Sequence, residues 1–457
     1  MSDHYDLIVI GAGSAARDGA GRAAKKHGAR VALIERERWG GSCPNVACSP
    51  TKAYIVAADL IHDINGLADV IGIEVGEARA NLARIHARKE ALKKPQEKWI
   101  EDLQGQGFDT IPGQAVFVDA HTVRVGDRTL TADRILIATG SRTAVPPIEG
   151  IEDVDWIDHV GALDLTELPA SLLVVGAGAV GLEFGQAFSR FGSDVTIVDA
   201  LDQIAPRSDP QSAGELEAAL EDEGIPVILG SFVKRVARDG DGLVATIVPR
   251  EGGAEREVRA ERIMLASGRK PNVEELLLDN VGVELEKTGI VVDERLRTTV
   301  PGIWAAGDVT GLALLTPVAQ YQARIAVDDM FGAGTRTADY SVLPTAIFTD
   351  PELAGIGLTE HEAKERGFDA AAVVHPLSGL KRAQYLNAKR GLFKIVYERT
   401  SRRVLGLHVV SRNASDVIQG FNVAISLHAT VDDLANAHHV FPTFAEGIKA
   451  AAEKALA

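Results

Sequence analysis

The sequence predicts an α/β protein with two Rossmann-like units, because the same pattern occurs twice along the chain. In each copy a buried strand ends in a glycine-rich turn, a helix follows, and a second strand ends in an acidic residue. The two turns begin about 165 residues apart. A lone glycine motif is weak, but two copies in full strand–turn–helix–strand context predict that the chain binds two dinucleotides.

The first copy begins with the apolar run 5–10, and its second strand covers residues 31–34. The helix N-terminus after such a turn binds a pyrophosphate, and the acidic residue binds a ribose hydroxyl. The predicted binding residues are Gly11, Gly13, Ala16 and Glu35.

The second copy has a strand over residues 172–175, a helix over 182–191 and a second strand over 195–198. Its corresponding binding residues are Gly176, Gly178, Gly181 and Asp199.

The only two cysteines of the 457 residues, Cys43 and Cys48, follow the first copy. Five residues of helix rise about 7.5 Å, beyond the roughly 4.4–6.8 Å between the Cα atoms of a disulfide. Pro44 and Pro50 disfavour a regular helix here, so a bend that brings the sulfurs together is expected. A helix that starts at Ser49 would favour a thiolate at Cys48. The pair therefore predicts a redox-active dithiol, and the alternative is two buried, reduced cysteines that lie close by chance.

Composition limits the class of protein. At 457 residues the chain has room for about three domains, and its hydrophobic fraction of 46% is ample for their cores. The net charge of −16 argues against a nucleic-acid surface. No apolar run approaches the roughly 20 residues that span a membrane, and residues 1–4 lead directly into the first strand, so no signal peptide is expected. Two cysteines in a redox role favour the reducing cytoplasm.

With these motifs the chain resembles the class I FAD-dependent pyridine nucleotide-disulfide oxidoreductases, which include dihydrolipoamide dehydrogenase, glutathione reductase and mercuric reductase. The resemblance covers essentially the whole length. Besides the two glycine turns, it rests on the segments 40–52, 137–141, 266–272, 302–308, 348–352, 355–360 and 442–447.

The resemblance implies an FAD-binding domain over residues 1–144 that returns over 271–339, and an NAD(P)-binding domain over 145–270. It also implies an α+β dimerisation domain over 340–457 and a homodimer whose active site is shared across the interface. No metal site is implied. The further cofactor-binding residues that it implies are Gly41, Ser42, Lys52, Thr139, Gly140, Gly268, Gly307 and Asp308, the last for the ribityl chain of the flavin.

The resemblance implies that reduced nicotinamide gives hydride to the flavin, which reduces the Cys43–Cys48 disulfide. Cys48 is then the thiolate next to the flavin, and Cys43 is the thiol that meets the acceptor. Lys52 would stabilise charge at the flavin N5 edge, with Glu183 as its partner. The alternative for Glu183 is an ordinary carboxylate in the first turn of a helix.

Asp199 predicts NADH as the donor, because a carboxylate accepts a hydrogen bond from a free 2′-hydroxyl and repels a 2′-phosphate. Residues 200–204 contain no arginine or lysine. NADPH is the alternative, since Arg207 follows shortly after.

The acceptor side departs from the disulfide-reducing members of the family, which have a histidine acid where this chain has Phe441. His439 is an alternative proton source, about 7 Å along an extended segment. Glu446 is a candidate catalytic residue, but Thr443-x-x-Glu446 is also a capping box that opens the last helix.

Other departures resemble mercuric reductases, which share the alanine at Ala16 and have a tyrosine at the position of Phe441. The C-terminal cysteine pair that delivers mercury in those enzymes is absent from this sequence. The sequence therefore predicts a mercuric reductase-like NAD(P)H:acceptor oxidoreductase, whose acceptor is a metal ion, a quinone or an activated disulfide. The alternatives are a disulfide reductase or dihydrolipoamide dehydrogenase with another proton source, and a redox-sensing flavoprotein subunit. The acceptor itself, and whether an accessory protein delivers it, stay open.

Overall fold

The computed structural model describes residues 3–332 and 334–457. Met1 and Ser2, at the start of the predicted first domain, and Ala333, in its predicted return, lie outside the described residues. The chain divides into two compact units. The first holds Met1–Thr51, Arg88–Ala144 and Gly268–Asp339, and the second holds Lys52–Ala87, Val145–Ser267 and Tyr340–Ala457.

A five-stranded parallel sheet in the order β18-β8-β2-β3-β4 forms the centre of the first unit. The predicted strand 5–10 is wrong in extent, because the chain bends at Asp6 and its two sides join different sheets. Such a bend places Tyr5 and Ile8 in one shared core instead of on alternate faces of one strand. The strands are β2 (Leu7–Ile10), β3 (Val31–Glu35), β4 (Asp109–Pro112), β8 (Ile135–Ile137) and β18 (Ile303–Ala305).

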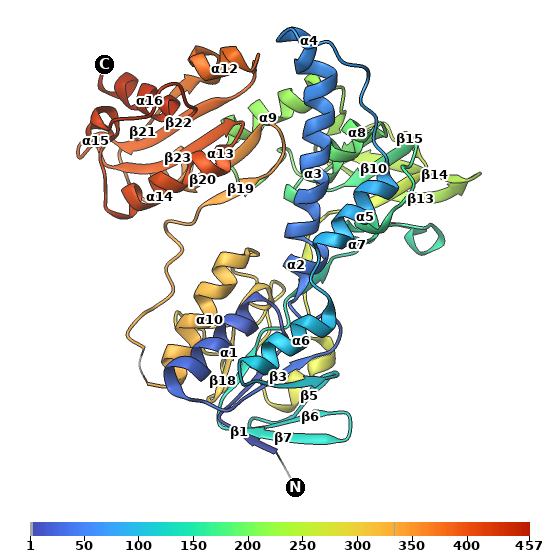
Figure 1. The fold of residues 1–457 in the computed structure, drawn as a ribbon, viewed down its shortest axis with the longest axis vertical. Helices are drawn as coiled ribbons and strands as arrows, with labels where there is room; N and C mark the ends of the chain where they lie inside the picture. The colour runs from blue at the N-terminus through green and yellow to red at the C-terminus, as the bar shows by residue number, and fades with distance from the viewer. Residues whose placement is uncertain (1–2, 333) are drawn as a thin grey trace. The chain divides into compact units, whose positions relative to one another are not determined.

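Helices cover one face of this sheet and a second sheet covers the other. The alanines of α1 let it pack closely on α10 and on the strands, and Figure 1 shows α1 and α10 side by side. Gly19 serves the same contact, since a Cβ there would lie 2.9 Å from the side chain of Leu136. The helices are α1 (Ser14–His27), α6 (Gln96–Gly105) and α10 (Thr316–Met330). The second sheet, in the order β1-β7-β6-β5, consists of β1 (Asp3–Tyr5), β5 (Ala115–Asp119), β6 (Thr122–Val125) and β7 (Arg128–Ala132).

The second unit repeats this three-layer plan. Its parallel sheet has the order β12-β11-β10-β16, with α8 and α9 on one face and the antiparallel sheet β13-β14-β15 on the other. Helix α8 begins at Ala179, three residues before the predicted start, because Leu182 already donates to the carbonyl of Gly178. The elements are α8 (Ala179–Phe191), α9 (Pro210–Asp222), β10 (Ser171–Val175), β11 (Asp194–Val198), β12 (Val227–Ile228), β13 (Ser231–Asp239), β14 (Gly242–Pro249), β15 (Arg256–Ala260) and β16 (Arg262–Leu265).

The C-terminal part of the second unit is an antiparallel sheet in the order β19-β20-β23-β22-β21, against which α16 packs (Figure 1). Helix α16 begins at Glu446, the last residue of the Thr443-x-x-Glu446 motif that was predicted to open this helix. The strands are β19 (Thr345–Ile347), β20 (Glu352–Gly357), β21 (Ala370–Pro376), β22 (Leu392–Glu398) and β23 (Val404–Ser411). The helices are α11 (Glu360–Glu365), α12 (Lys381–Tyr385), α13 (Ala414–Val417), α14 (Gln419–Ser426), α15 (Val431–Asn436) and α16 (Glu446–Leu456).

The sheet topology confirms the predicted α/β class with its two parallel-sheet units. Among the described residues, no helix has the length and apolar character needed to cross a membrane. The remaining elements are α2 (Ser42–Val46), α3 (Cys48–His62), α4 (Ala68–Val70), α5 (Leu82–Leu92), α7 (His159–Asp164), β9 (Ser141–Thr143), β17 (Arg269–Pro271) and short turns of helix η1 (Asp63–Leu67), η2 (Ile151–Asp153), η3 (Glu274–Leu276), η4 (Leu278–Asn280), η5 (Asp308–Thr310) and η6 (Leu377–Gly379).

Candidate functional site

The glycine turn of the first unit holds an acidic side chain at the end of β3. Gly11 has a φ of +108°, and a Cβ there would lie 2.3 Å from the carbonyl oxygen of Ala138. The turn is therefore restricted to glycine. The Glu35 carboxylate accepts hydrogen bonds from the backbone N–H groups of Ala12 and Glu37, each at 2.8 Å. These bonds fix the carboxylate where the sequence predicts a ribose.

A cavity of about 360 Å³ opens at this end of the parallel sheet of the first unit. Gly11, Glu35 and Thr139 line it, together with the loop that contains Asn272. Thr139 donates its hydroxyl to the carbonyl of Asn272 at 2.7 Å, so the two walls are joined. The glycine turn, the fixed carboxylate and the cavity fit the adenosine part of a bound FAD.

The second glycine turn repeats this geometry within the second unit. Gly176 has a φ of +116°, and a Cβ there would lie 2.5 Å from the carbonyl oxygen of Ala266. The Asp199 carboxylate accepts hydrogen bonds from Ala177 N–H at 2.6 Å and from Leu201 N–H at 2.8 Å. Gly181 lies so close to the turn that a Cβ would be 1.8 Å from the oxygen of Gly176. This unit therefore fits a second dinucleotide.

The other predicted cofactor residues of the first unit lie in a connected polar network. The carboxylate of Asp308 accepts from the hydroxyl of Ser141 at 2.6 Å, and Arg269 Nε donates to that hydroxyl oxygen at 2.7 Å. Sequence reasoning missed Ser141 and Arg269 as partners, because more than 120 residues separate each of them from its contact in the chain. The backbone of the predicted residues is also held by hydrogen bonds: Gly307 N–H donates to Gln322, Gly140 C=O accepts from Asn272, and Gly268 C=O accepts from Ala144.

The dithiol segment consists of two helices, α2 and α3, that meet at Ala47. No regular helix runs through the segment, as predicted, but Pro44 and Pro50 do not exclude helix locally, since each lies in the first turn of one of these helices. Backbone N–H groups in a first turn have no acceptor within the helix, so proline costs nothing there. The expected bend occurs at Ala47, with φ −136° and ψ −105°.

Cys43 and Cys48 form a close pair, with Cys43 partly buried and Cys48 exposed. The Sγ of Cys48 lies 3.9 Å from the hydroxyl of Thr316, which begins α10. The segment is fixed on the first glycine turn, because a Cβ at Gly41 would lie 2.4 Å from the Cα of Gly13. The segment that carries the pair therefore packs against the glycine turn that fits the flavin nucleotide. Ser42, also predicted to bind the cofactor, is the exposed first residue of α2.

Lys52 and Glu183 form an ion pair in the second unit. Lys52 Nζ donates to Glu183 at 2.8 Å, and Phe348 N–H donates to the other carboxylate oxygen at 3.0 Å. The side chain of Glu183 is 7% exposed, whereas Lys52 is 34% exposed. Lys52 Nζ also lies 4.1 Å from the ring centroid of Phe348. Sequence reasoning missed Phe348 as a partner, although it begins a segment that carried the resemblance.

A second contact joins α3 to α8 through Arg190, whose side chain is 3% exposed. Its guanidinium donates to Asp59 at 2.6 Å and to Glu223 at 2.7 Å. Burial raises the pKa of Asp59 to about 7, although the charge of Arg190 opposes the shift. The folded protein thus binds a proton at Asp59 more tightly than the unfolded chain does.

The stability contribution of Asp59 is expected to depend on pH. Between about pH 4 and pH 7 the folded state binds more protons at this site than the unfolded state, so the free energy of unfolding falls as pH rises. In Asp59→Asn this part of the pH dependence is lost, and the stability of the variant relative to the parent should increase from pH 5 to pH 8. Urea unfolding at both pH values measures the difference. The exposed Asp69→Asn is the matched control, and an equal pH response in both variants would contradict the expectation.

His439 and Glu446 form hydrogen bonds within the C-terminal segment, and the ring of His439 also stacks on Phe421 of α14. Phe441 is 67% exposed, and His439 Nδ1 lies 3.2 Å from the carbonyl of Ala437. Glu446 accepts a hydrogen bond from Thr443 N–H at 2.8 Å, while the hydroxyl of Thr443 donates to Val440. The bond from Thr443 N–H to the Glu446 carboxylate is one of the two bonds of the predicted capping box. The other bond, from Glu446 N–H to the Thr443 hydroxyl, is absent among the described residues.

Comparison with known proteins gives consistent matches. Residues 5–323 match the family model described as pyridine nucleotide-disulphide oxidoreductase, and residues 343–452 match the dimerisation domain of that family. A mercuric reductase from Staphylococcus aureus is 36% identical over 454 residues, which are 98% of this chain and 82% of the relative. A dihydrolipoyl dehydrogenase from Thermus scotoductus is 35% identical, over 98% of this chain and 97% of the relative.

A solved structure also matches. The Cu(II) complex of the HOCl-induced flavoprotein disulfide reductase RclA from Escherichia coli has a TM-score of 0.88 and 30% identity, covering 99% of this chain and 100% of that one.

Proposed function

The chain belongs to the pyridine nucleotide-disulphide oxidoreductase family, and on that premise we propose that it passes electrons from NAD(P)H to the Cys43–Cys48 pair and on to an acceptor. The members of this family depend on FAD and take electrons from NAD(P)H. The observation that carries the proposal is the close cysteine pair on a segment fixed to the first glycine turn, beside the cavity at Glu35. Cys43 and Cys48 are the only cysteines of the sequence, so no other thiol pair competes for the role.

The residues present fit FAD in the first unit and a nicotinamide dinucleotide in the second. Glu35 and Asp308 would bind the adenosine ribose and the ribityl chain, and Gly11 and Gly13 would let the pyrophosphate approach α1. When bound, FAD supplies the transfer of two electrons from NAD(P)H to a disulfide. In the second unit Gly176, Gly178 and Asp199 would hold the nicotinamide dinucleotide.

The chain's own groups act on charge and protons. In the oxidised protein Cys43 and Cys48 form a disulfide, and two electrons break this bond to leave two sulfurs that take up protons or stay as thiolates. Lys52, held by Glu183, would stabilise the negative charge that develops next to it. The pair then gives the two electrons to the acceptor, which Cys43 contacts, any remaining thiol protons are lost to solvent or to the acceptor, and the Cys43–Cys48 disulfide forms again.

We propose NADH as the preferred donor. The Asp199 carboxylate, fixed by two backbone N–H groups, suits a ribose 2′-hydroxyl and repels a 2′-phosphate. Arg207 is exposed, and Arg250, which donates to the carbonyl of Ala200 at 3.3 Å, is already paired with Asp202. NADPH is the alternative donor.

The acceptor is proposed to be a metal ion, a quinone or an activated disulfide. Phe441 cannot transfer a proton to a leaving thiol, so an acceptor that needs no histidine acid suits this chain. The names of two matched proteins mention a metal ion: one is a mercuric reductase, and the other is RclA in a complex with Cu(II). Thiolates bind such soft or borderline metal ions well.

Lipoamide or another ordinary disulfide is the second candidate for the acceptor. The identity to dihydrolipoyl dehydrogenase is 35%, close to that of the mercuric reductases. His439 would then have to supply the proton that Phe441 cannot. The candidate function that is not enzymatic is that of a redox-sensing flavoprotein subunit.

The family's dimerisation domain over residues 343–452 supports a homodimer. We propose that its active site is shared across the interface and that Glu446 contributes to it. A reducing compartment such as the cytoplasm suits a dithiol that cycles.

Anaerobic titration of the purified protein with NADH, and separately with NADPH, tests the proposal. We expect a long-wavelength absorbance from a thiolate next to the flavin after two electrons, at a lower concentration of NADH than of NADPH. Bleaching of the flavin without this absorbance would exclude the cysteine pair from the electron path. Cu(II), Hg(II), a quinone and lipoamide are then offered as acceptors. Turnover with lipoamide at an ordinary enzymatic rate would establish the second candidate, and turnover with none of them would favour the redox sensor.

A further inference from the structure

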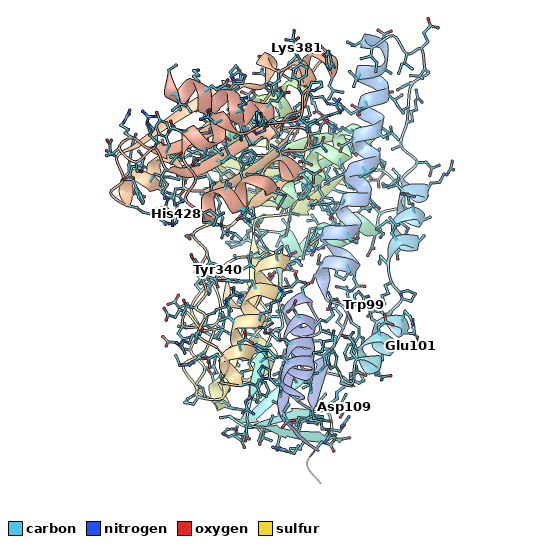
Figure 2. All side chains as sticks on the ribbon, turned by 60° about the vertical axis from the view of Figure 1, so that its left-hand side comes forward. Trp99, Glu101, Asp109, Tyr340, Lys381 and His428 are labelled. Atoms are coloured by element: carbon cyan, nitrogen blue, oxygen red, sulfur yellow. The ribbon has the colours of Figure 1, made fainter. Side chains whose placement is uncertain are left out.

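Arg17 on α1 approaches the segment that carries Cys43. Its guanidinium carbon lies 4.6 Å from the ring centroid of Trp99, on α6. The same ring packs on the backbone just before Cys43, since a Cβ at Gly40 would lie 2.6 Å from it. Figure 2 labels Trp99 at this place on the first unit. One aromatic ring therefore contacts both the arginine and the start of the dithiol segment.

Hydrogen bonds fix this segment against α6. Trp39 N–H donates to Gln96 Oε1 at 2.7 Å, and Gln96 Nε2 donates to Asn45 Oδ1 at 3.0 Å. Asn45, which is 4% exposed, in turn donates to the carbonyls of Trp39 and Gly41. The residues on both sides of Cys43 are thus held in place relative to Trp99.

Arg17 also differs from its charged neighbours in its pairing. On α1, Asp18 is paired with Arg324 of α10 at 2.6 Å. Lys94, which lies 4.1 Å from the ring centroid of Trp99, is paired with Asp102 of α6. Within the part of the chain that the structure describes, no carboxylate forms an ion pair with Arg17, and its buried Nε has no hydrogen-bond partner. Arg17, Asp18, Lys94 and Asp102 line one cavity of about 260 Å³ together with Trp99.

From this geometry we propose that Arg17 is a positioning residue that stabilises the thiolate of Cys43. The inference rests on the proposed function in taking Cys43 as the thiol that meets the acceptor. A fixed positive charge beside a cysteine favours loss of the thiol proton to solvent, and the thiolate is the form that attacks disulfides and binds metal ions. The electrostatics agree: burial lowers the pKa of Arg17, and the charges of Cys43 and, to a smaller extent, Asp18 oppose that shift.

Stabilisation of the Cys43 thiolate by Arg17 would compensate for the lack of a histidine acid and base at the position of Phe441. A guanidinium keeps its charge throughout the physiological pH range, whereas a histidine titrates within it. The thiolate of Cys43 would therefore be present over a broad pH range without a neighbour that must first be protonated.

Alkylation of Cys43 tests the proposal without any electron transfer. In Cys48→Ser holoprotein Cys43 is the only thiol of the chain, so the rate of its reaction with iodoacetamide across pH reports its ionisation. Adding Arg17→Gln should raise the apparent pKa of Cys43 by about one unit and slow alkylation at pH 7 about tenfold. Arg17→Lys should keep most of the low pKa of Cys43 and most of its alkylation rate, because lysine retains the positive charge. Lys94→Met, which removes a cation on the same ring that is already paired, is the matched control and should leave the value unchanged.

Two results would overturn the proposal. One is an unchanged pKa in Arg17→Gln, and the other is an equal rise in Lys94→Met. If Arg17→Gln does not fold with bound flavin, iodoacetate and iodoacetamide are compared in the Cys48→Ser protein itself. Because a nearby cation attracts the anionic iodoacetate, the ratio of the iodoacetate rate to the iodoacetamide rate should be higher for Cys43 than for free cysteine. A ratio equal to that of free cysteine would refute the proposal. Failure of the proposed function would appear only in the anaerobic titration.

Discussion

Replacement of Cys43 by serine is expected to lower NAD(P)H-driven reduction of the acceptor by about three orders of magnitude or more. The reason is that a hydroxyl cannot form the disulfide through which electrons leave, so the loss affects a covalent step and not a binding contact. Steady-state turnover with the acceptor identified in the screen measures this effect. Flavin absorbance should stay, because the Cβ of residue 43 keeps its place in α2.

Ser49→Ala is the matched control for Cys43→Ser, since Ser49 is an exposed residue next to Cys48. It should turn over at the parental rate. Retention of most of the turnover in Cys43→Ser would mean that electrons reach the acceptor without the cysteine pair.

Lys394→Met is expected to lower the free energy of unfolding by about 3–5 kcal/mol. Lys394 Nζ donates to Asp209 at 2.7 Å, and the two side chains are 7% and 1% exposed. Burial lowers the pKa of the neighbouring His408, which favours its neutral form, so Lys394 is the cation that compensates Asp209. Removing it leaves a buried carboxylate without its counter-charge. Urea or thermal unfolding of the holoprotein measures the loss.

Two further variants isolate the buried pair. Adding Asp209→Asn to Lys394→Met removes the uncompensated charge but keeps an oxygen that can cap α9, and it should recover a substantial part of the stability. Lys381→Met at the exposed lysine labelled in Figure 2 should change stability by less than about 0.5 kcal/mol. If Lys394→Met were as mild as Lys381→Met, the pair would contribute no more than a surface contact.

Local sequence patterns were enough to predict the two nucleotide-binding units. A strand, a glycine turn, a helix and an acidic strand end lie within about 30 residues of each other, and each part has its own chemical reason. The backbone of Gly11 and Gly176 follows from this local requirement, as do the hydrogen-bonded carboxylates of Glu35 and Asp199. The fold class and the family could therefore be derived without any structure.

Local rules were wrong where their context was missing. Pro44 and Pro50 were expected to disfavour a regular helix, but each is accommodated in a first turn, and this depends on where α2 and α3 begin. The run 5–10 was expected to be one strand, but pairing with β7 separates β1 from β2. For β1 a contact outside the segment determined the local structure.

The sequence by itself determined the α/β class, the two glycine turns and the cysteine pair, because each depends on residues that are near neighbours in the chain. Only the tertiary structure decided which charges meet. Arg17 and Trp99 are on different helices, and Lys394 and Asp209 are 185 residues apart. No periodicity or motif encodes such distances, since the energy of an ion pair or of a cation over a ring depends on separation and burial in space. The partners of the catalytic candidates are therefore known only once the sheets and helices have packed.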